Sequence, residues 1–294
     1  MKPAPSVIIF TTLSGLGFGF LAMLGLGLVP VQGWAAFFHW AFGYGLAVGG
    51  LISSTFHLGH PERAWRAFSQ WRSSWLSREG VAAVATLMIL APQALSDWWG
   101  LGWGQGFGIL GALGCGVTVL CTAMIYAQLK TVPRWHHWTV PATYLAFALT
   151  GGLILAGGGL WASLAALVLG GLLSLGWQVG DRAFARAGVD LASATGLSAL
   201  GTPKVFEQPH TGGNYLMREM IFTVGRRHVR KLRIIALILS SVIPAVLCAT
   251  LPMVIALVLA GTAHILGAFA QRWLFFAEAE HVVALYYGGP TRAS

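Results

Sequence analysis

The most restrictive feature of this sequence is the length of the stretches without any charged side chain. No Asp, Glu, Lys or Arg occurs in five stretches: 3–61, 80–96, 98–129, 135–180 and 234–271. A helix needs about 20 apolar residues to cross the hydrocarbon core of a bilayer, so each stretch can hold one or more spans. Only 9% of the residues are charged, against about a quarter in a soluble domain. The sequence therefore predicts an integral membrane protein.

Hydropathy and turn signals together predict an all-α fold with eight transmembrane helices, forming a single membrane domain over residues 1–294. The predicted spans lie near 7–29, 34–57, 79–97, 105–129, 138–157, 159–178, 233–251 and 253–277. Their tight turns are Val29-Pro30, Gly100 to Gly104, Gly157 to Gly159 and Leu251-Pro252, all on one side of the membrane. The segment 179–232 is too polar to span and is predicted to lie on the other side.

The basic residues indicate which side faces the cytoplasm. With eight spans, all 18 Lys and Arg fall on the side of the N-terminus, the loops 58–78 and 130–137, the segment 179–232 and the C-terminus. The positive-inside rule makes this the cytoplasmic side and places both termini there. The topology also explains the net charge of +9 better than nucleic-acid binding does.

The interior of the predicted bundle argues against a proton-driven carrier and against a metal or haem site. The span centres contain no carboxylate and no Lys, which counts against a proton-driven carrier. Cys115, Cys121 and Cys248 all lie in apolar runs without metal-ligand spacing, so no metal site is expected. A b-type haem needs two facing imidazoles, and we expect no haem in this chain. A single haem between His39 and His264 stays open as an alternative, as does a structural His264 bonded to a neighbouring helix.

The charged segment HLGHPERAWRAFSQWRSSWLSREG, residues 57–80, begins at the end of the first uncharged stretch. Pro61 cannot continue a helix, so His57 is expected on the last turn of the second span. Ser77 is predicted to cap the third span and to leave Glu79 in its first turn, where the helix dipole favours a carboxylate. Histidine exchanges protons near neutral pH. The segment thus suggests a quinone pocket, with the residues His57, Glu79, Arg63 and Arg78.

Other groups near this segment have weaker claims to a role. His60, His264 and Arg272 are secondary candidates for the quinone pocket. Glu79 could instead be a capping carboxylate paired with Arg78. The tryptophans of the segment are typical of an interfacial belt, and Arg66 and Arg72 could face phospholipid.

Several motifs resemble one known family. His57-Leu58-Gly59, Pro61 and Arg63-Ala64, followed by Leu76-Ser77-Arg78-Glu79, resemble the signature loop of the dimethyl sulfoxide reductase membrane-anchor family. Thr131-Val132-Pro133 with Trp135 is similar to that family's segment after the fourth span. The resemblance implies a haem-free subunit that exchanges electrons with membrane quinone, ubiquinone or menaquinone. It implies a molybdopterin catalytic subunit and a four-cluster iron–sulfur subunit as partners, and it maps the family's quinol-binding histidine and acidic residue onto His57 and Glu79.

The predicted orientation favours one branch of the family. In the dimethyl sulfoxide reductases the signature loop faces the periplasm, whereas the charge count here places it in the cytoplasm. This inversion, and the segment 179–232, resemble the anchors of cytoplasm-facing sulfite dehydrogenases. We therefore expect a protein of the bacterial inner membrane that passes electrons from sulfite to quinone. The alternatives are a quinol-oxidising anchor of an S- or N-oxide reductase and an anion transporter that uses the arginine-rich mouth.

The predicted partner-docking surface combines two segments. Arg66 and Arg72 belong to the 58–78 loop, and Tyr215 and Arg218 belong to the segment 179–232. Residues 215–233 could form an amphipathic surface helix, with apolar side chains on one face and arginines elsewhere. The alternative is a helix that lies on anionic lipid.

Overall fold

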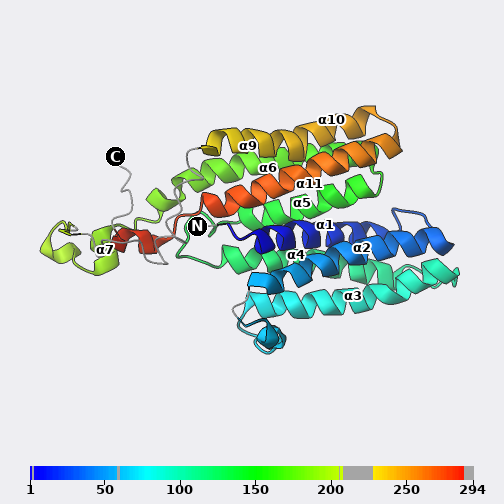
Figure 1. Ribbon diagram of the computed structural model, residues 1–294, viewed down its shortest axis with the longest axis horizontal. Coiled ribbons are helices and arrows are strands. Elements are labelled where there is room, and N and C mark those ends of the chain that lie inside the picture. The colour runs from blue at the N-terminus through cyan, green and yellow to red at the C-terminus, as the bar shows by residue number, and fades with distance from the viewer. Residues whose placement is uncertain (2, 58–59, 205, 208–227, 288–294) are drawn as a thin grey trace.

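The computed structural model describes residues 1, 3–57, 60–204, 206–207 and 228–287, without the side chains of His57 and Tyr287. Every regular element in this part of the chain is a helix, as predicted. The long helices run side by side along the longest axis of the molecule (Figure 1). Their bounds are α1 Pro5–Gly25, α2 Gly33–Ser53, α3 Trp75–Trp99, α4 Gly106–Ala127, α5 Thr139–Leu155, α6 Gly159–Arg186, α9 Val229–Leu237, α10 Ile243–Thr250 and α11 Met253–Ala277.

Seven of the helical segments that the structure describes are long and apolar enough to cross a membrane. They include α2 with the turn that follows it, and α9 with α10 as one continuous helix. The helix α5 is apolar but has only 17 residues, and it lies where the fifth of the eight spans was predicted. The chain is therefore a multi-pass membrane protein with seven candidate spans.

Three helices extend beyond their predicted bounds by four or more residues. The helix α3 begins at Trp75 rather than at residue 79, and α6 continues to Arg186 rather than ending at 178. The helix α9 begins at Val229 rather than at 233. Both ends of the polar segment 179–232 are thus helical extensions of membrane helices. Of the predicted surface helix over 215–233, residues 215–227 lie outside the described residues.

Short elements occupy the loops at one end of the bundle. They are η1 Ser54–His57, η2 Pro61–Phe68, α7 Leu191–Thr195, η3 Ser198–Leu200 and η6 Val282–Tyr287. The helix α7 and the N-terminus lie at the same end (Figure 1). There the N-terminal amine donates to the carbonyl of Ala279, and the Tyr286 hydroxyl donates to the carbonyl of Ala194 at 2.6 Å.

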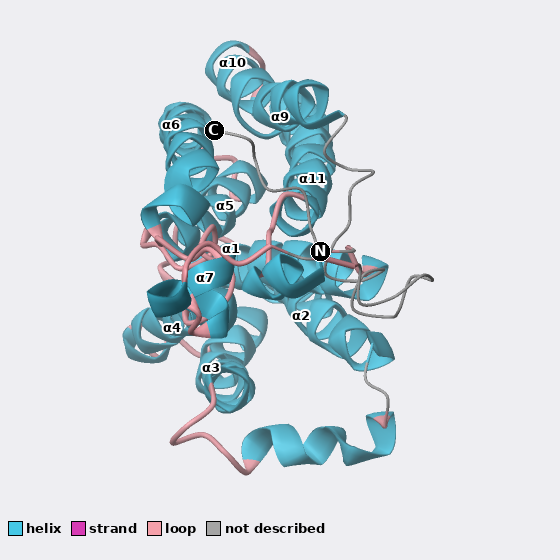
Figure 2. Cartoon of the chain, turned by 90° about the vertical axis from the view of Figure 1, so that its left-hand side faces the viewer, coloured by secondary structure: helices cyan, strands magenta, loops and turns pink. Residues whose placement is uncertain are grey.

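The helix α1 lies in the centre and joins two halves (Figure 2). The N-terminal half is α1 to α4, and the C-terminal half is α5, α6, α9, α10 and α11; α1 packs against α2, α4, α5 and α11. Glycines let these backbones touch: a Cβ on Gly17 would overlap the backbone of Ala47, and one on Gly19 the carbonyl of Ala148. Close approach of small residues replaces apolar burial as the source of helix association in lipid.

The helix from α9 to α10 contains a π-helical turn, η5 Ile238–Val242. Pro244 follows this turn and has no N–H to donate to the carbonyl four residues earlier, that of Ser240. The ring of His264 in α11 forms a hydrogen bond with this carbonyl instead, with Nδ1 3.0 Å from the oxygen. The irregular turn and the buried imidazole therefore stabilise each other.

Candidate functional site

The carboxyl group of Glu79 is buried between α3 and α4. Glu79 is 3% exposed, and the Thr122 hydroxyl of α4 donates to it. One turn earlier in α4, the Thr118 hydroxyl lies 3.3 Å from that of Thr86 in α3. No cation that the structure describes lies within ion-pair distance of Glu79. Ionisable groups inside a membrane bundle are costly and are commonly retained for function.

The start of α3 corrects two predictions. Ser74 takes the N-cap position, Ser77 is buried inside the helix, and the first turn contains no acidic residue. Glu79 therefore lies beyond the first turn, and its environment is not that of a capping carboxylate. The helix begins earlier because the guanidinium of Arg78 covers the ring of Trp75, 4.4 Å from its centroid, and so stabilises the added turn.

Arg78 does not pair with Glu79. Its Nε donates to the carbonyl of Trp71 at 3.0 Å, and its Nη2 donates to that of Arg72 at 2.7 Å. Arg78 thus ties the preceding loop to α3. Neighbouring positions on a helix point in different directions, so Arg78 faces the loop while Glu79 faces α4.

The other residues of the signature loop either lie at the surface or are not among the described residues. His60 Nδ1 lies 2.9 Å from Glu62 Oε1, and Arg63 Nε lies 3.8 Å from the same oxygen. All three side chains are more than half exposed. The backbone of His57 closes η1, but the side chain of His57 lies outside the described residues, as do residues 58–59. Whether His57 meets Glu79 stays a prediction.

The predicted docking arginines lie on aromatic rings. The guanidinium carbons of Arg66 and Arg72 lie 5.6 Å and 5.5 Å from the ring centroids of Trp65 and Trp71. Both tryptophans are exposed. The element that carries Trp65, η2, projects from the bundle beside α3 (Figure 2). Tyr215 and Arg218, the other predicted docking residues, lie outside the described residues.

The sequence reasoning missed a cluster of four charged side chains at the same end of the C-terminal half. Arg134 donates to Asp181 at 2.5 Å and to Glu278 at 3.0 Å. Arg233 donates to Asp181 at 2.6 and 2.8 Å and to Glu278 at 2.7 Å. Glu278 is the most buried member, with 4% of its side chain exposed. We call these four residues the ion-pair cluster.

A sequence signal for the ion-pair cluster exists. The chain has only nine carboxylates against 18 cations, and Asp181 and Glu278 follow the ends of two predicted spans, on the side where every arginine lies. Carboxylates at that depth are expected to pair. What the sequence does not show is that the ends of α6, α9 and α11 meet around Arg134.

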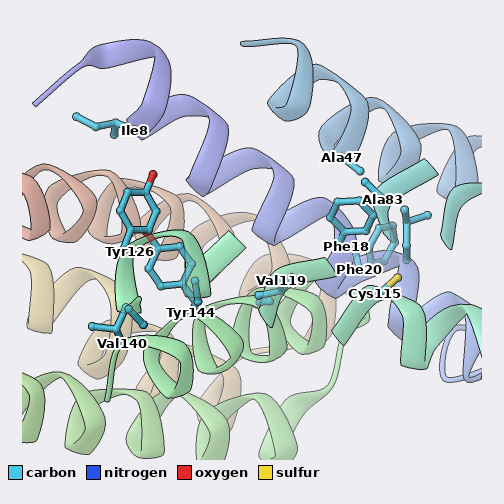
Figure 3. Close-up of a cluster of buried hydrophobic side chains, with 14 of the residues drawn as sticks. Ile8, Phe18, Phe20, Ala47, Ala83, Cys115, Val119, Tyr126, Val140 and Tyr144 are labelled. Atoms are coloured by element: carbon cyan, nitrogen blue, oxygen red, sulfur yellow. The ribbon is translucent and has the colours of Figure 1, made fainter. Parts of the chain in front are cut away.

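Arg272, a secondary candidate, lies beside this cluster and is 2% exposed. It belongs to the last two turns of α11, which ends at Ala277, and its side chain lies inside the bundle. Its guanidinium carbon lies 3.5 Å from the ring centroid of Tyr144 in α5. The rings of Tyr144 and Tyr126 lie 6.0 Å apart in the core (Figure 3).

The two membrane histidines have separate hydrogen-bond partners. His264 Nε2 lies 3.4 Å from the carbonyl of Phe147, in addition to the contact of Nδ1 with Ser240. His39 Nδ1 donates to the carbonyl of Ala35 at 2.7 Å. The structure therefore supports the interpretation of His264 as a buried imidazole bonded to neighbouring helices.

His137, in the loop before α5, is the titratable group nearest to the start of that helix. Its Nδ1 accepts from the backbone N–H of Thr139 at 3.3 Å. Burial and the positive charge of Arg186 lower the pKa of His137 from its usual value. A neutral ring is required for this acceptor role, so the lowered pKa preserves the contact.

The sequence matches one family model and is similar to two known proteins. The family model described as DMSO reductase anchor subunit (DmsC) matches residues 3–175. The sulfite dehydrogenase C subunit of Allochromatium vinosum is 30% identical over 331 aligned positions, which cover 98% of this chain and 99% of that protein. The anaerobic dimethyl sulfoxide reductase chain YnfH of Escherichia coli is 30% identical over 171 positions, 51% of this chain and 55% of YnfH. No solved structure matches.

Proposed function

The chain belongs to the DMSO reductase anchor subunit (DmsC) family, and from that premise we propose that it reduces membrane quinone with electrons from sulfite. It is a membrane anchor subunit of an oxidoreductase of this family. Its proposed partners are a molybdopterin subunit, which oxidises sulfite, and a four-cluster iron–sulfur subunit, which delivers the electrons.

The extent of the two matches supports sulfite as the substrate. The similarity to the sulfite dehydrogenase protein of Allochromatium vinosum extends over nearly the whole of both chains, including the segment 179–232. The similarity to YnfH covers about half of each chain. Because the longer match includes the polar segment that we expect to face the partner subunits, the oxidative direction is favoured over the reduction of an S- or N-oxide.

The proposed topology has eight spans, with both termini in the cytoplasm of a bacterium. The helix α5, counted with the seven candidate spans, brings their number to eight. Its 17 residues reach the lower end of the length that can cross a bilayer, about 17 to 25 residues. All lysines and arginines then lie on the cytoplasmic side. The partner subunits would dock on that side of the inner membrane.

The buried carboxyl group of Glu79 is the observation that carries the proposed quinone site. It lies near the charged end of α3, hydrogen-bonded to Thr122, and offers an acceptor or a donor to a quinone oxygen. His57, at the end of α2, is proposed to exchange the second proton. Arg63 and Arg78 are held at the surface by Glu62 and by loop carbonyls, so we assign them to the mouth of the pocket. Both protons would come from the cytoplasm, and the reaction would be electroneutral.

The test separates quinone chemistry from assembly. In the purified complex, we expect His57→Ala and Glu79→Gln to lower quinone reduction about 100-fold, as for loss of a proton-transfer group. Sulfite oxidation with a soluble dye acceptor should persist. Asp97→Asn is the matched control, because Asp97 stands at the other end of α3, bonded to Trp40 and Gln93. Loss of both activities in the His57 and Glu79 variants would mean that these residues act in assembly.

The docking surface for the iron–sulfur subunit is proposed to include Arg66, Arg72, Tyr215 and Arg218. Arg66 and Arg72 are available because aromatic rings, rather than carboxylates, hold them. Deletion of residues 205–215 should abolish co-purification of the iron–sulfur subunit. A fully assembled complex after this deletion would rule out the segment as part of the surface.

A further inference from the structure

Arg272 has a buried guanidinium that no described carboxylate neutralises. Its Nη1 donates to Gln271 Oε1 at 3.3 Å, and its Nε has no hydrogen-bond partner among the described residues. The rings of Tyr144 and Phe147 cover it, with centroids 3.5 and 5.1 Å away. A buried cation without a counter-ion is unfavourable, so this arginine calls for a further partner.

The carboxylates of the ion-pair cluster already have partners. Glu278 and Asp181 are each bonded to both Arg134 and Arg233. Each of these carboxylates thus balances the arginines of the ion-pair cluster and not Arg272. The positive charge of Arg272 is therefore an addition to a cluster that is already paired.

Arg272 lines a cavity of about 50 Å³ between α5, α6 and α11. The polar side chains around it are Thr139, Thr143, Tyr144, Gln271, Arg134 and Glu278. The Tyr144 hydroxyl, like Arg272 Nε, has no partner in the described chain. A native protein rarely leaves buried polar groups without water or a ligand. Two such groups at one cavity indicate that the cavity is filled.

The size of the cavity favours a compact ligand. A cavity needs a volume of about 10–15 Å³ to hold one water. This cavity therefore has room for a few waters or for a group of four or five heavy atoms. A substituted quinone ring is larger. The donors at the cavity include the Arg272 guanidinium, the hydroxyls of Thr139, Thr143 and Tyr144, and the Gln271 amide. A guanidinium binds oxygens of a planar or tetrahedral anion in two parallel hydrogen bonds.

We propose that this cavity binds a compact oxyanion of the sulfite, sulfate or phosphate class, with Arg272 as the charged recognition group. Thr143 and Gln271 supply further hydrogen bonds. The site lies in the C-terminal half, whereas the proposed quinone site lies between α3 and α4. It does not rest on the quinone proposal, and the two can fail separately.

The experiment is a thermal unfolding titration of the full chain, purified in a sugar-based detergent without phosphate. Sodium sulfite, sulfate and phosphate are added at constant ionic strength, with chloride as the replacement salt. We expect at least one of the three anions to raise the unfolding temperature in a saturable way, by about 2–5 °C at 100 times its dissociation constant. Chloride should give no saturable rise.

Two variants and one matched control assign the effect to the cavity. Arg272→Gln should lose the saturable rise, and Thr143→Val should raise the half-saturating concentration at least threefold. Arg182→Gln removes the same charge from a position on α6 outside the cavity and should respond like the unchanged chain. If Arg272→Gln does not fold, the Thr143→Val titration shows whether the anion binds in the cavity.

Two results would overturn the proposal: no saturable response to any of the three anions, or an unchanged response when either cavity residue is replaced. Repeating the titration in phospholipid nanodiscs identifies the source of the anion. A response retained in nanodiscs indicates a free anion. A response that disappears there, while the unfolding temperature rises in an Arg272-dependent way, indicates a lipid phosphate.

Discussion

The two halves of the bundle use their arginines differently. In the N-terminal half, arginines lie on tryptophan rings and backbone carbonyls, and the carboxylate Glu62 beside Arg63 is itself exposed. In the C-terminal half, Arg134 and Arg233 share two carboxylates and are mostly buried. The first arrangement leaves positive charge at the surface, where a partner or a lipid can meet it. The second uses the charge inside the protein to hold the ends of α6, α9 and α11 together.

The buried ionisable groups of the two halves differ in the same way. Glu79 is an acid without a described cation, bonded to a hydroxyl, and Arg272 is a cation without a described carboxylate, covered by aromatic rings. Neither is explained by stability, since burial of a single charge is unfavourable. Each half therefore has one buried group suited to a ligand. The Glu79 carboxyl suits a quinone oxygen, and the Arg272 guanidinium suits an anion.

The largest expected effect comes from breaking the ion-pair cluster. Glu278→Gln removes a carboxylate that is 4% exposed and leaves Arg134 and Arg233 with one shared partner. We expect a loss of about 3 kcal/mol in the free energy of unfolding, since removing one member of a buried pair costs roughly 3–5 kcal/mol. The measurement is denaturant unfolding of the purified chain.

The contrast with the N-terminal half supplies the control for that variant. Glu62→Gln breaks an exposed contact to His60 and Arg63, and we expect it to leave stability within about 0.5 kcal/mol, as for a surface pair. Equal losses in Glu278→Gln and Glu62→Gln would remove the distinction between the halves.

The second prediction concerns the exposed arginines. Replacing both Arg66 and Arg72 with Ala should weaken the binding of the iron–sulfur subunit about tenfold, corresponding to about 1.4 kcal/mol, and should leave the stability of the anchor unchanged. Lys130→Ala is the control, because it removes an exposed charge from another loop at the same end. Unchanged binding in the double variant would assign these arginines to lipid rather than to the partner.

The third prediction concerns the hydrogen bond to Glu79. Thr122→Val removes the donor with little change in volume, and we expect quinone reduction to fall threefold to tenfold, since such a bond is worth about 0.5–1.5 kcal/mol. Dye-linked activity should not change. Thr118→Val, one turn away in α4, is the matched control. A similar loss in both variants would point to a packing effect at the α3–α4 interface.

Much of the fold could be predicted because long uncharged runs and glycine or proline turns are local signals. The start of α3 could not, since it depends on Arg78 covering Trp75 and bonding two loop carbonyls. For the candidate site, the sequence pointed to Glu79 through its place after a charged loop, but not to Thr122, its partner across the interface. The ion-pair cluster depends on contacts over 45 to 144 positions of sequence separation, which local patterns do not contain.

The smallest expected effect is a pH dependence from the C-terminal half. The pKa of His137 is lowered in the folded chain, by burial first and by Arg186 second. Its contribution to stability is therefore fully present above the unfolded pKa of about 6.5 and is lost as the pH falls from there through the lower pKa of the folded chain. We expect His137→Gln to flatten the decline in unfolding temperature between pH 7 and pH 5. His60→Gln, in the exposed contact with Glu62, should leave the decline as it is, because a surface pair contributes little. A decline that is the same with and without His137 would show that other groups cause it, and would remove this loop from the features that distinguish the two halves.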